Sequence, residues 1–374
     1  MSEPAVATQA AKTQAKTQAD AAQTIVIAAG GTGGHVFPAL AVASVLRERD
    51  IPVLWVGSQA GMENQVVTDN GIPIRQITVS PLRGGGLLRK SMGVVNLIKA
   101  IASSLKIVRQ VKPRTVLGMG GYVSGPVCIA ARLTGCRMVV HEQNAVPGFT
   151  NRVLGRIANR VLEAIPNTFR SSNKITCTGN PVRRELLEVD DPEVRYSQRQ
   201  GPLRVLVIGG SQGARALNTT VPQALALLHE SVTVIHQCGK RWRAETEAAY
   251  SELSHEFTVK EFIQDMADVY GWADIIVCRS GAMTVAEVAA VGLASILVPF
   301  PAAVDDHQTI NGAYLVDAGA AVMVQESDMT AQTLADQIQS LSRTALQKMA
   351  SNARRVSKRD ATDRVVAELT GAAA

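Results

Sequence analysis

The chain has 374 residues, of which 46% are hydrophobic, 19% charged and 4% aromatic, and its formal net charge is +6. This length suffices for two domains that each bury a core, and the composition is that of a globular protein. So few aromatic side chains argue against a base-stacking surface, and we expect no nucleic-acid partner. The five cysteines form no CxxC pair and no metal-ligand spacing, which is typical of reduced thiols in a cytosolic protein.

Residues 1–23 are rich in Ala, Gln, Thr and Lys, which predicts a disordered tail without the apolar core of a secretion signal. No later stretch reaches the ~18 consecutive apolar residues of a membrane span. The first clear pattern is the apolar run 25–29, followed by GGTGGH and a periodic apolar stretch. It predicts a buried strand, a glycine-rich loop and a helix whose N-terminus can hold an anion. His35 closes this loop and can exchange a proton near neutral pH.

Two common nucleotide-binding motifs match the loop poorly. The dinucleotide fingerprint needs a third glycine where Val36 stands, and an acidic residue after the second strand, 53–56. A P-loop needs glycine before its Lys-Ser pair, but Arg89 precedes Lys90 here. A dehydrogenase is therefore the weaker interpretation of this strand–loop–helix unit.

The stretch from Arg83 to Arg114 carries eight cations and no acidic residue. Apolar residues within 94–108 recur with helical spacing, which predicts a helix whose apolar face packs on the domain core. The preceding loop, 83–90, combines cations with two leucines, and anionic phospholipids attract such a segment. We predict that the membrane contact is made by Arg83, Leu87, Leu88, Arg89 and Lys90.

Apolar runs separated by glycine, proline or helical stretches predict further strands at 53–56, 74–79, 115–118, 137–141, 175–178, 203–208, 232–236, 274–278 and 294–298. A second strand-to-glycine loop, GGSQGAR at 209–215, repeats the opening of the first half. Each half therefore predicts a doubly wound α/β domain, spanning 24–189 and 203–351. The polar segment 190–202 predicts the linker between them.

Polar or glycine-rich segments follow several strands, at the edge where such sheets gather functional groups. GMGGYVSGP at 118–126 has more glycines than one turn needs, which favours a ligand loop over a tight turn. HEQN at 141–144 either faces a ligand or lets one or two side chains satisfy buried backbone groups. CRSGAMTVAE at 278–287 opens a helix whose N–H groups can hold a diphosphate while Glu287 accepts ribose hydroxyls. DDH at 305–307 lacks further ligands at a definite spacing, so we expect no metal there.

These motifs also carry a resemblance. GGTGGHVFPALAVA, GMGGYVSGP, HEQNAVPG, GNPVR, GGSQGARALN, CRSGAMTVAE and DDHQTIN occur in this order over residues 25 to 320. In them the chain closely resembles the bacterial peptidoglycan glycosyltransferases of the MurG family, which add N-acetylglucosamine to lipid I and form lipid II. The resemblance implies a GT-B fold, with two Rossmann-like doubly wound domains facing a cleft. A C-terminal helix, at about 352–370, would pack back toward the first domain.

The same resemblance implies an inverting, metal-independent and cofactor-free transfer from UDP-N-acetylglucosamine to the 4-hydroxyl of N-acetylmuramic acid. It implies a peripheral protein at the cytoplasmic face of the bacterial inner membrane. Expected partners are lipid I, anionic inner-leaflet phospholipids and other cell-wall synthesis proteins. A non-catalytic, membrane-recruited nucleotide-sugar sensor would share the donor contacts but form no product.

Carried over position by position, the resemblance implies functional side chains in both halves. Ile263 would lie with its backbone beside the uracil, and Glu287 would hold the ribose. We expect His35 to be the general base because imidazole has a suitable pKa, with Glu142 as the alternative. The implied donor contacts are Thr32, Gly33, Gly34, Asn144, Arg183, Ser211, Ile263, Ala282, Met283, Thr284, Val285, Ala286, Glu287 and Gln308.

Overall fold

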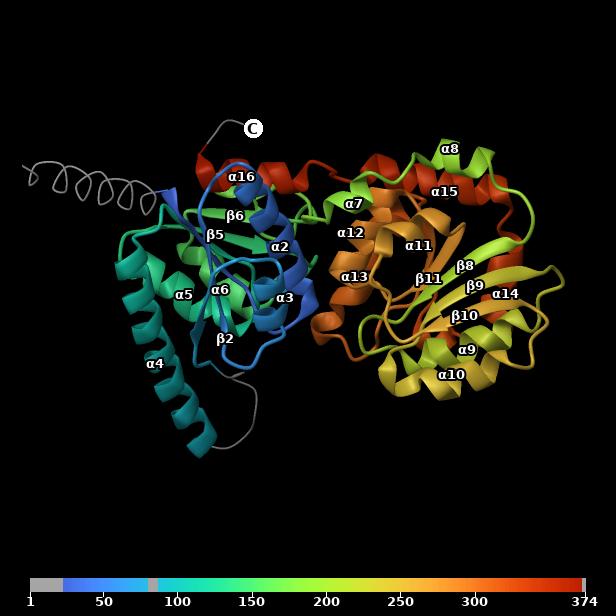
Figure 1. Ribbon diagram of the computed structural model, residues 1–374, viewed down its shortest axis with the longest axis horizontal. Coiled ribbons are helices and arrows are strands. Elements are labelled where there is room, and N and C mark those ends of the chain that lie inside the picture. Colours follow the sequence, from blue (N-terminus) through green and yellow to red (C-terminus); the bar gives the residue numbers. More distant parts are fainter. Residues whose placement is uncertain (1–22, 80–86, 372–374) are drawn as a thin grey trace, which may run out of the picture. The chain divides into compact units, whose positions relative to one another are not determined.

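The computed structural model describes residues 23–79 and 87–371, with the backbone alone at 87–92, and it divides into two α/β units (Figure 1). The first unit holds the chain up to Gln143, residues Pro147–Pro181 and the segment from Asp360 onward. The second holds Asn144–Val146 and Val182–Arg359. The second unit therefore begins before the predicted linker, and 190–202 is part of that unit and contains helix α8 (Pro192–Ser197).

The sheet of the first unit is entirely parallel, in the order β3-β2-β1-β4-β5-β6-β7. The interior strand β1 is fully buried, in keeping with its continuous apolar sequence IVIA. Ile25 lies opposite Val53 and Thr115, so the loops that follow β1 and β4 leave the sheet at the same edge. The strands are β1 (Ile25–Ala28), β2 (Val53–Ser58), β3 (Ile74–Ile77), β4 (Thr115–Gly118), β5 (Arg137–Glu142), β6 (Arg160–Glu163) and β7 (Ile175–Cys177).

Helices cover both faces of this sheet. One apolar layer joins the sheet to α2, α3 and α16, and the other joins it to α4, α5 and α6. Trp55 is fully buried in the first layer, and Val123 in the second. The helices are α2 (Gly33–Glu48), α3 (Glu63–Asp69), α4 (Leu87–Val111), α5 (Gly121–Leu133), α6 (Phe149–Ile157) and α16 (Ala361–Thr370).

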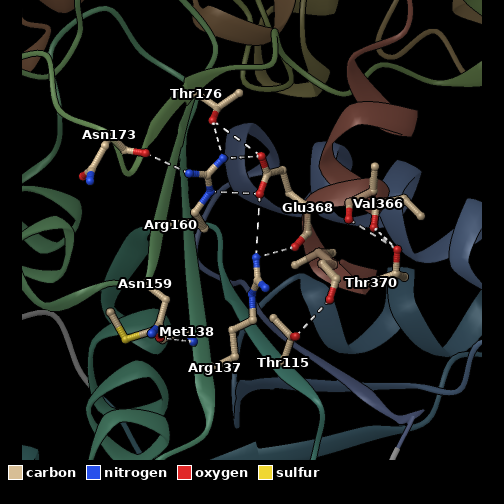
Figure 2. Close-up of polar contacts among 12 residues, drawn as sticks. Thr115, Arg137, Met138, Asn159, Arg160, Asn173, Thr176, Val366, Glu368 and Thr370 are labelled. Carbon is tan, nitrogen blue, oxygen red and sulfur yellow. Dashed lines mark hydrogen bonds and ion pairs between the residues drawn. The ribbon is translucent and has the colours of Figure 1, made fainter. Parts of the chain in front are cut away.

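Polar contacts dock α16 onto the first unit (Figure 2). Glu368 accepts two hydrogen bonds from Arg160, from Nε at 3.0 Å and Nη2 at 2.7 Å. Arg137 donates to the backbone carbonyl of Glu368 at 3.0 Å, and Thr115 donates to the carbonyl of Leu369 at 2.9 Å. Residues 352–356 of the predicted C-terminal helix instead end α15 (Arg343–Val356), which belongs to the second unit.

Helix α4 includes the predicted helix 94–108 and begins earlier, so the predicted loop 83–90 is helical from Leu87 onward. Arg83 and the side chains of Leu87, Leu88, Arg89 and Lys90 lie outside the described part of the chain. The expected burial of the apolar face is wrong at Val94 and Ile98, near the start of the described side chains of α4. Three side chains there are 57%, 50% and 60% exposed, namely Val94, Val95 and Ile98. Within residues 23–79 and 87–371, no helix has the length and apolar character needed to cross a bilayer.

The second unit is built in the same way on a parallel sheet with the order β10-β9-β8-β11-β12-β13. One apolar layer joins the sheet to α9, α14 and α15, and the other joins it to α11, α12 and α13. The strands are β8 (Leu203–Ile208), β9 (Val232–Gln237), β10 (Glu256–Lys260), β11 (Ile275–Cys278), β12 (Ala294–Leu297) and β13 (Ala321–Met323). Besides α8 and α15, the helices are α7 (Arg184–Leu187), α9 (Arg215–Leu225), α10 (Arg243–Tyr250), α11 (Met266–Trp272), α12 (Ala282–Val291), α13 (His307–Asp317) and α14 (Ala331–Ser340), with short 3-10 turns η1 (Lys240–Trp242), η2 (Val304–Asp306) and η3 (Glu326–Asp328).

Candidate active site

The first glycine loop joins β1 to α2 and places His35 in the first turn of that helix. Thr32 is the N-cap residue and makes no side-chain capping bond, while Gly33 and Gly34 open the helix. Gly31 has a φ of +95°, a conformation that glycine adopts without strain. The loop therefore presents a helix N-terminus, which suits an anion, beside an imidazole.

A buried carboxylate that the sequence analysis missed holds this loop. Glu63 is fully buried at the start of α3 and accepts hydrogen bonds from Ser58 N at 2.8 Å, Ser58 Oγ at 2.7 Å and Gly31 N at 3.3 Å. A Cβ built at Gly30 would lie 2.4 Å from Glu63 Oε1, and one at Gly61 only 2.0 Å from Oε2. Glycines are thus required here so that the backbone can enclose the carboxylate. The signal in the sequence was the cluster of glycines around one acidic residue.

The glycine loop that follows β4 and contains Gly120 and Gly121 packs against the loop after β1. Gly120 and Gly121 have φ values of +95° and +73°. A Cβ at Gly120 would lie 2.9 Å from His35 Cε1, and a Cβ at Gly121 would lie 2.7 Å from the carbonyl oxygen of Gly30. Both glycines are therefore needed for the close approach of these two loops, whether or not they also contact a ligand.

The HEQN segment at the end of β5 connects to His35. Nδ1 of His35 lies 3.0 Å from Oε1 of Gln143, and Nε2 of Gln143 lies 3.2 Å from Nδ1 of His141. Nε2 of His141 lies 3.0 Å from the carbonyl oxygen of Gly179. Burial lowers the pKa of His141 to about 4, against smaller opposing effects of the Gly179 hydrogen bond and the charge of Glu142. His141 is thus a neutral, buried link that joins the backbone to His35 through Gln143.

Glu142, the alternative base, is buried and faces the start of α6. Its Oε2 accepts hydrogen bonds from Gly148 N at 3.1 Å and Asn151 Nδ2 at 2.8 Å. Asn151 also donates to the carbonyl oxygen of His141 at 3.0 Å. These bonds anchor α6 to the end of β5.

In the second unit, Arg183 and Glu287 come together although they are far apart in sequence. Nη2 of Arg183 lies 3.5 Å from Oε1 of Glu287, and the hydroxyl of Tyr270 donates to Oε2 at 3.1 Å. Burial raises the pKa of Glu287, while Arg183 and the Tyr270 hydrogen bond oppose that rise. Tyr270 was not predicted, because it lies in an apolar stretch typical of a core helix. The group presents a carboxylate whose two oxygens are fixed from both sides.

Two further segments of the second unit offer backbone groups to an anion. Helix α12 begins at Ala282 after the N-cap Gly281, which makes no side-chain capping bond, and 282–287 form its first turns. The second glycine-rich loop, GGSQG at 209–213, follows β8 and exposes Ser211. Gly213 has a φ of +73°, and a Cβ there would lie 1.8 Å from the carbonyl oxygen of Cys238. This loop is therefore pressed against the end of β9.

Gln237, at the end of β9, bridges two segments of this unit. Its Oε1 accepts a hydrogen bond from Ile263 N at 2.8 Å, and its Nε2 donates to the carbonyl oxygen of Gly210 at 3.1 Å. The N–H of Ile263 is therefore occupied. A nucleobase could therefore be contacted only by the other backbone group of Ile263, its carbonyl oxygen.

Asn144 and Gln308, two of the expected donor contacts, form hydrogen bonds with different parts of the second unit. Oδ1 of Asn144 accepts from Nδ2 of Asn311 at 3.2 Å, and Oδ1 of Asn311 accepts from Ala145 N at 2.8 Å. Gln308 is half-buried, and its Oε1 accepts from Phe300 N at 3.0 Å. Asn311 is fully buried and was missed as a site residue, although it ends the DDHQTIN motif.

Comparison with known proteins identifies the family. The model of the glycosyltransferase family 28 N-terminal domain matches residues 25–163, and that of the C-terminal domain matches 204–365. The chain belongs to glycosyltransferase family 28. A relative from Marinobacter nauticus is 48% identical over 342 residues, which is 90% of this chain and 94% of the relative. One from Burkholderia pseudomallei is 48% identical over 359 residues, 94% of this chain and 97% of the relative.

Both relatives are named UDP-N-acetylglucosamine--N-acetylmuramyl-(pentapeptide) pyrophosphoryl-undecaprenol N-acetylglucosamine transferase. The crystal structure of MurG from Acinetobacter baumannii matches with a TM-score of 0.83 and 43% identity, over 93% of this chain and 99% of that one. These matches confirm the resemblance and the two-domain GT-B fold. The family 28 chain is a glycosyltransferase, and its predicted site residues fall into two groups, one in each unit. His35, Glu142 and residues 32–34 belong to the first unit; the other predicted donor contacts belong to the second.

Proposed function

We infer that this chain transfers N-acetylglucosamine from UDP-N-acetylglucosamine to lipid I and forms lipid II for peptidoglycan synthesis. The observation that carries the inference is the similarity along nearly the whole chain to the two N-acetylglucosamine transferases and to the solved MurG structure. Two helix starts without side-chain caps, and the imidazole beside one of them, support this assignment. Such groups suit the transfer of a sugar from a nucleoside diphosphate.

We propose His35 as the general base of a single inverting displacement. Nε2 of His35 has no hydrogen-bond partner among the described residues, whereas both the other nitrogen and the Glu142 carboxylate are bonded within the fold. Nε2 would take the proton of the 4-hydroxyl of N-acetylmuramic acid. The hydroxyl oxygen then bonds to the anomeric carbon as the bond from that carbon to UDP breaks.

In the second unit, we propose that the leaving diphosphate is held by the first turn of α12, Ala282, Met283, Thr284, Val285 and Ala286, together with Ser211 and Arg183. Backbone N–H groups at a helix start and a guanidinium stabilise developing negative charge without a metal ion. We therefore propose a metal-independent transfer without a cofactor, to be tested by adding EDTA. Glu287 would hold the ribose hydroxyls, the Ile263 carbonyl would accept the uracil N3–H, and Asn144 and Gln308 would contact the donor.

We also propose that the chain works as a peripheral protein on the cytoplasmic face of the inner membrane, bound to anionic phospholipids. The exposed valines and isoleucine of α4 support this proposal, since Lys99, Lys106 and Arg109 of the same helix are also exposed. Apolar residues flanked by cations bind an anionic lipid surface. Other cell-wall synthesis proteins remain expected partners at the same surface.

One incubation tests the reaction. The full chain is mixed with UDP-N-acetylglucosamine and a short-chain lipid I analogue, and disaccharide product and UDP are measured together. We expect both in equal amounts, and His35→Ala should lower kcat by ~100-fold or more. Donor binding without product would support a nucleotide-sugar sensor instead. Near-wild-type turnover by His35→Ala would reject His35 as the base and leave Glu142→Gln as the next variant to measure.

A further inference from the structure

A chain of hydrogen bonds runs from the backbone of the first unit to His35, and one end of it has a fixed direction. The carbonyl oxygen of Gly179 can only accept a hydrogen bond, and Nε2 of His141 lies 3.0 Å from it. Nε2 of His141 must therefore carry the hydrogen. The opposite arrangement would leave two acceptors facing each other in a fully buried place.

The next link is the amide of Gln143, which is itself buried. Because burial keeps His141 neutral, its Nδ1 is an acceptor. The Gln143 nitrogen faces this Nδ1 at 3.2 Å and the carbonyl oxygen of His141 at 3.3 Å. Two acceptors on the same side require the NH2 group there. The orientation of the amide thus follows from its neighbours, and its oxygen must point the other way.

The last link is His35. The Gln143 oxygen lies 3.0 Å from Nδ1 of His35 and can only accept. Nδ1 of neutral His35 therefore carries the hydrogen, and the lone pair is on Nε2. Each of the three hydrogen bonds has one possible donor. The donor–acceptor direction set at Gly179 therefore determines which nitrogen of His35 carries the hydrogen.

We propose that Gln143 and His141 are positioning residues that fix the tautomer of His35, so that Nε2 is its basic nitrogen. The proposal rests on the proposed role of His35 as the general base. Many catalytic histidines are oriented by a carboxylate, which also stabilises the imidazolium. A neutral glutamine fixes the ring and its tautomer while adding no negative charge beside the loop that faces an anionic substrate.

The tautomer can be measured directly in the wild-type enzyme. In protein labelled with ¹⁵N-histidine, the protonated and unprotonated ring nitrogens have distinct chemical shifts. We expect the Nδ1–H form for neutral His35 and the Nε2–H form for His141, each assigned with a single His→Gln variant. An Nε2–H form of His35 would overturn the proposal. This measurement does not depend on turnover, so it stands even where His35 fails as the base.

A buried histidine in the second unit provides an internal control. His236 Nε2 lies 3.0 Å from Oδ1 of Asn218, whose Nδ2 donates to the carbonyl oxygen of Cys238 at 3.0 Å. Nδ1 of His236 lies 2.9 Å from the hydroxyl of Tyr250. The same reasoning gives the Nε2–H form, and burial lowers the pKa of His236 to about 3. Its signal should not change in any Gln143 variant.

Variants of Gln143 then separate positioning from packing. Gln143→Leu removes the acceptor, and we expect a mixed tautomer of His35 and a kcat lowered ~10-fold or more, with the KM for donor little changed. Gln143→Glu keeps an acceptor toward His35 and, with its other oxygen protonated, a donor toward Nδ1 of His141, so it should restore the Nδ1–H form of His35. In a His35→Ala background, Gln143→Leu should have no further effect, because it acts through His35. Additive losses, or an unchanged tautomer in Gln143→Leu, would contradict the proposal.

Discussion

Glu287 is the residue whose burial bears most directly on its proposed function, which is to bind the ribose of the donor. Its carboxylate is largely withdrawn from water, with Arg183 on one oxygen and the Tyr270 hydroxyl on the other, and both favour its charged form. Burial still raises its pKa above that of an ordinary glutamate. A carboxylate in this state is a strong acceptor for ribose hydroxyls, but it takes up a proton more readily than one on the surface.

The first prediction concerns this residue. Glu287→Ala should weaken donor binding by about 1–3 kcal/mol, because a desolvated ribose hydroxyl loses its acceptor. In the wild type, the KM for UDP-N-acetylglucosamine should rise as the pH falls through the raised pKa, since the protonated carboxyl accepts poorly. Steady-state kinetics over the acid range measure this. Glu287→Gln, which cannot ionise, should show no such rise; a parallel rise in this variant would assign the pH dependence to another group.

At the residue scale, the sequence led to candidate site residues but not to the side chains that hold their segments. His35 and Glu287 are candidates because glycine-rich loops and helix starts have short local signatures. Glu63, Gln237 and Tyr270 could not be predicted, because each acts through contacts with residues distant in the chain, such as Gly31, Ile263 and Glu287. The donor–acceptor direction of the His141–Gln143–His35 hydrogen bonds could not be predicted either, because it is set by the carbonyl of Gly179, which is distant in the chain.

At the scale of elements, the C-terminal helix α16 shows how a short helix is fixed to a sheet built much earlier in the chain. Val365, Val366 and Leu369 supply a fully buried apolar face against α2 and the sheet. The bidentate pair of Arg160 and Glu368 then sets the position of the helix along β6 (Figure 2). Such a pair is directional as well as attractive.

We predict that Glu368→Gln lowers the free energy of unfolding by about 1–2 kcal/mol at neutral pH, because both partners are only partly buried. Arg160 lowers the pKa of Glu368, so this contribution is present above the ordinary glutamate pKa and is lost as the pH falls through the lowered one. Urea unfolding at several pH values measures it. Asp363→Asn on the same helix is the control, since its exposed pair with Arg49 should contribute little. Equal effects of the two variants would contradict the special role of Glu368.

The same scale shows which strands the sequence could not reveal. β8 contains the apolar run VLVI at 205–208 and β4 the run VLG at 116–118, and both strands form where they were predicted. The missed strands are β6 (RVLE), β10 (EFTVK) and β13 (AVM), which are short or carry charges. β10 is an edge strand with alternating exposure, so it lacks the apolar run of a central strand. Pairing with a neighbour, and not local composition, makes these segments strands.

For the whole molecule, the open question is how a chain whose described helices are all too short or polar to cross a bilayer meets a lipid-linked acceptor. The sequence placed the membrane contact in the segment 83–90 and the next helix in the core. The structure instead exposes Val94, Val95 and Ile98 on α4, in the helix that follows that segment. The exposed apolar residues and the predicted cationic segment are thus adjacent in the chain, and each can be replaced separately.

The last prediction uses this separation. Replacing Arg83, Arg89 and Lys90 with Glu should weaken binding to vesicles that contain anionic phospholipid, by roughly 1 kcal/mol for each cation removed and more by reversal of charge. The effect should be largest at low salt, where screening is least. Replacing Val94, Val95 and Ile98 with Ser should also weaken binding, but that loss should vary little with salt because it removes apolar contact with lipid.

Sedimentation with vesicles of anionic or zwitterionic lipid measures both losses, and a water-soluble acceptor reports whether the site survives. Turnover of that acceptor should be unchanged in both triple variants, whereas turnover of vesicle-embedded lipid I should fall with the binding. Ser replacing Ile310, an exposed apolar residue in α13 of the second unit, is the matched control and should leave vesicle binding intact. Unchanged binding in both triple variants would place the membrane contact away from α4. If only the charge-reversed variant lost binding, the exposed apolar side chains of α4 would not enter the lipid.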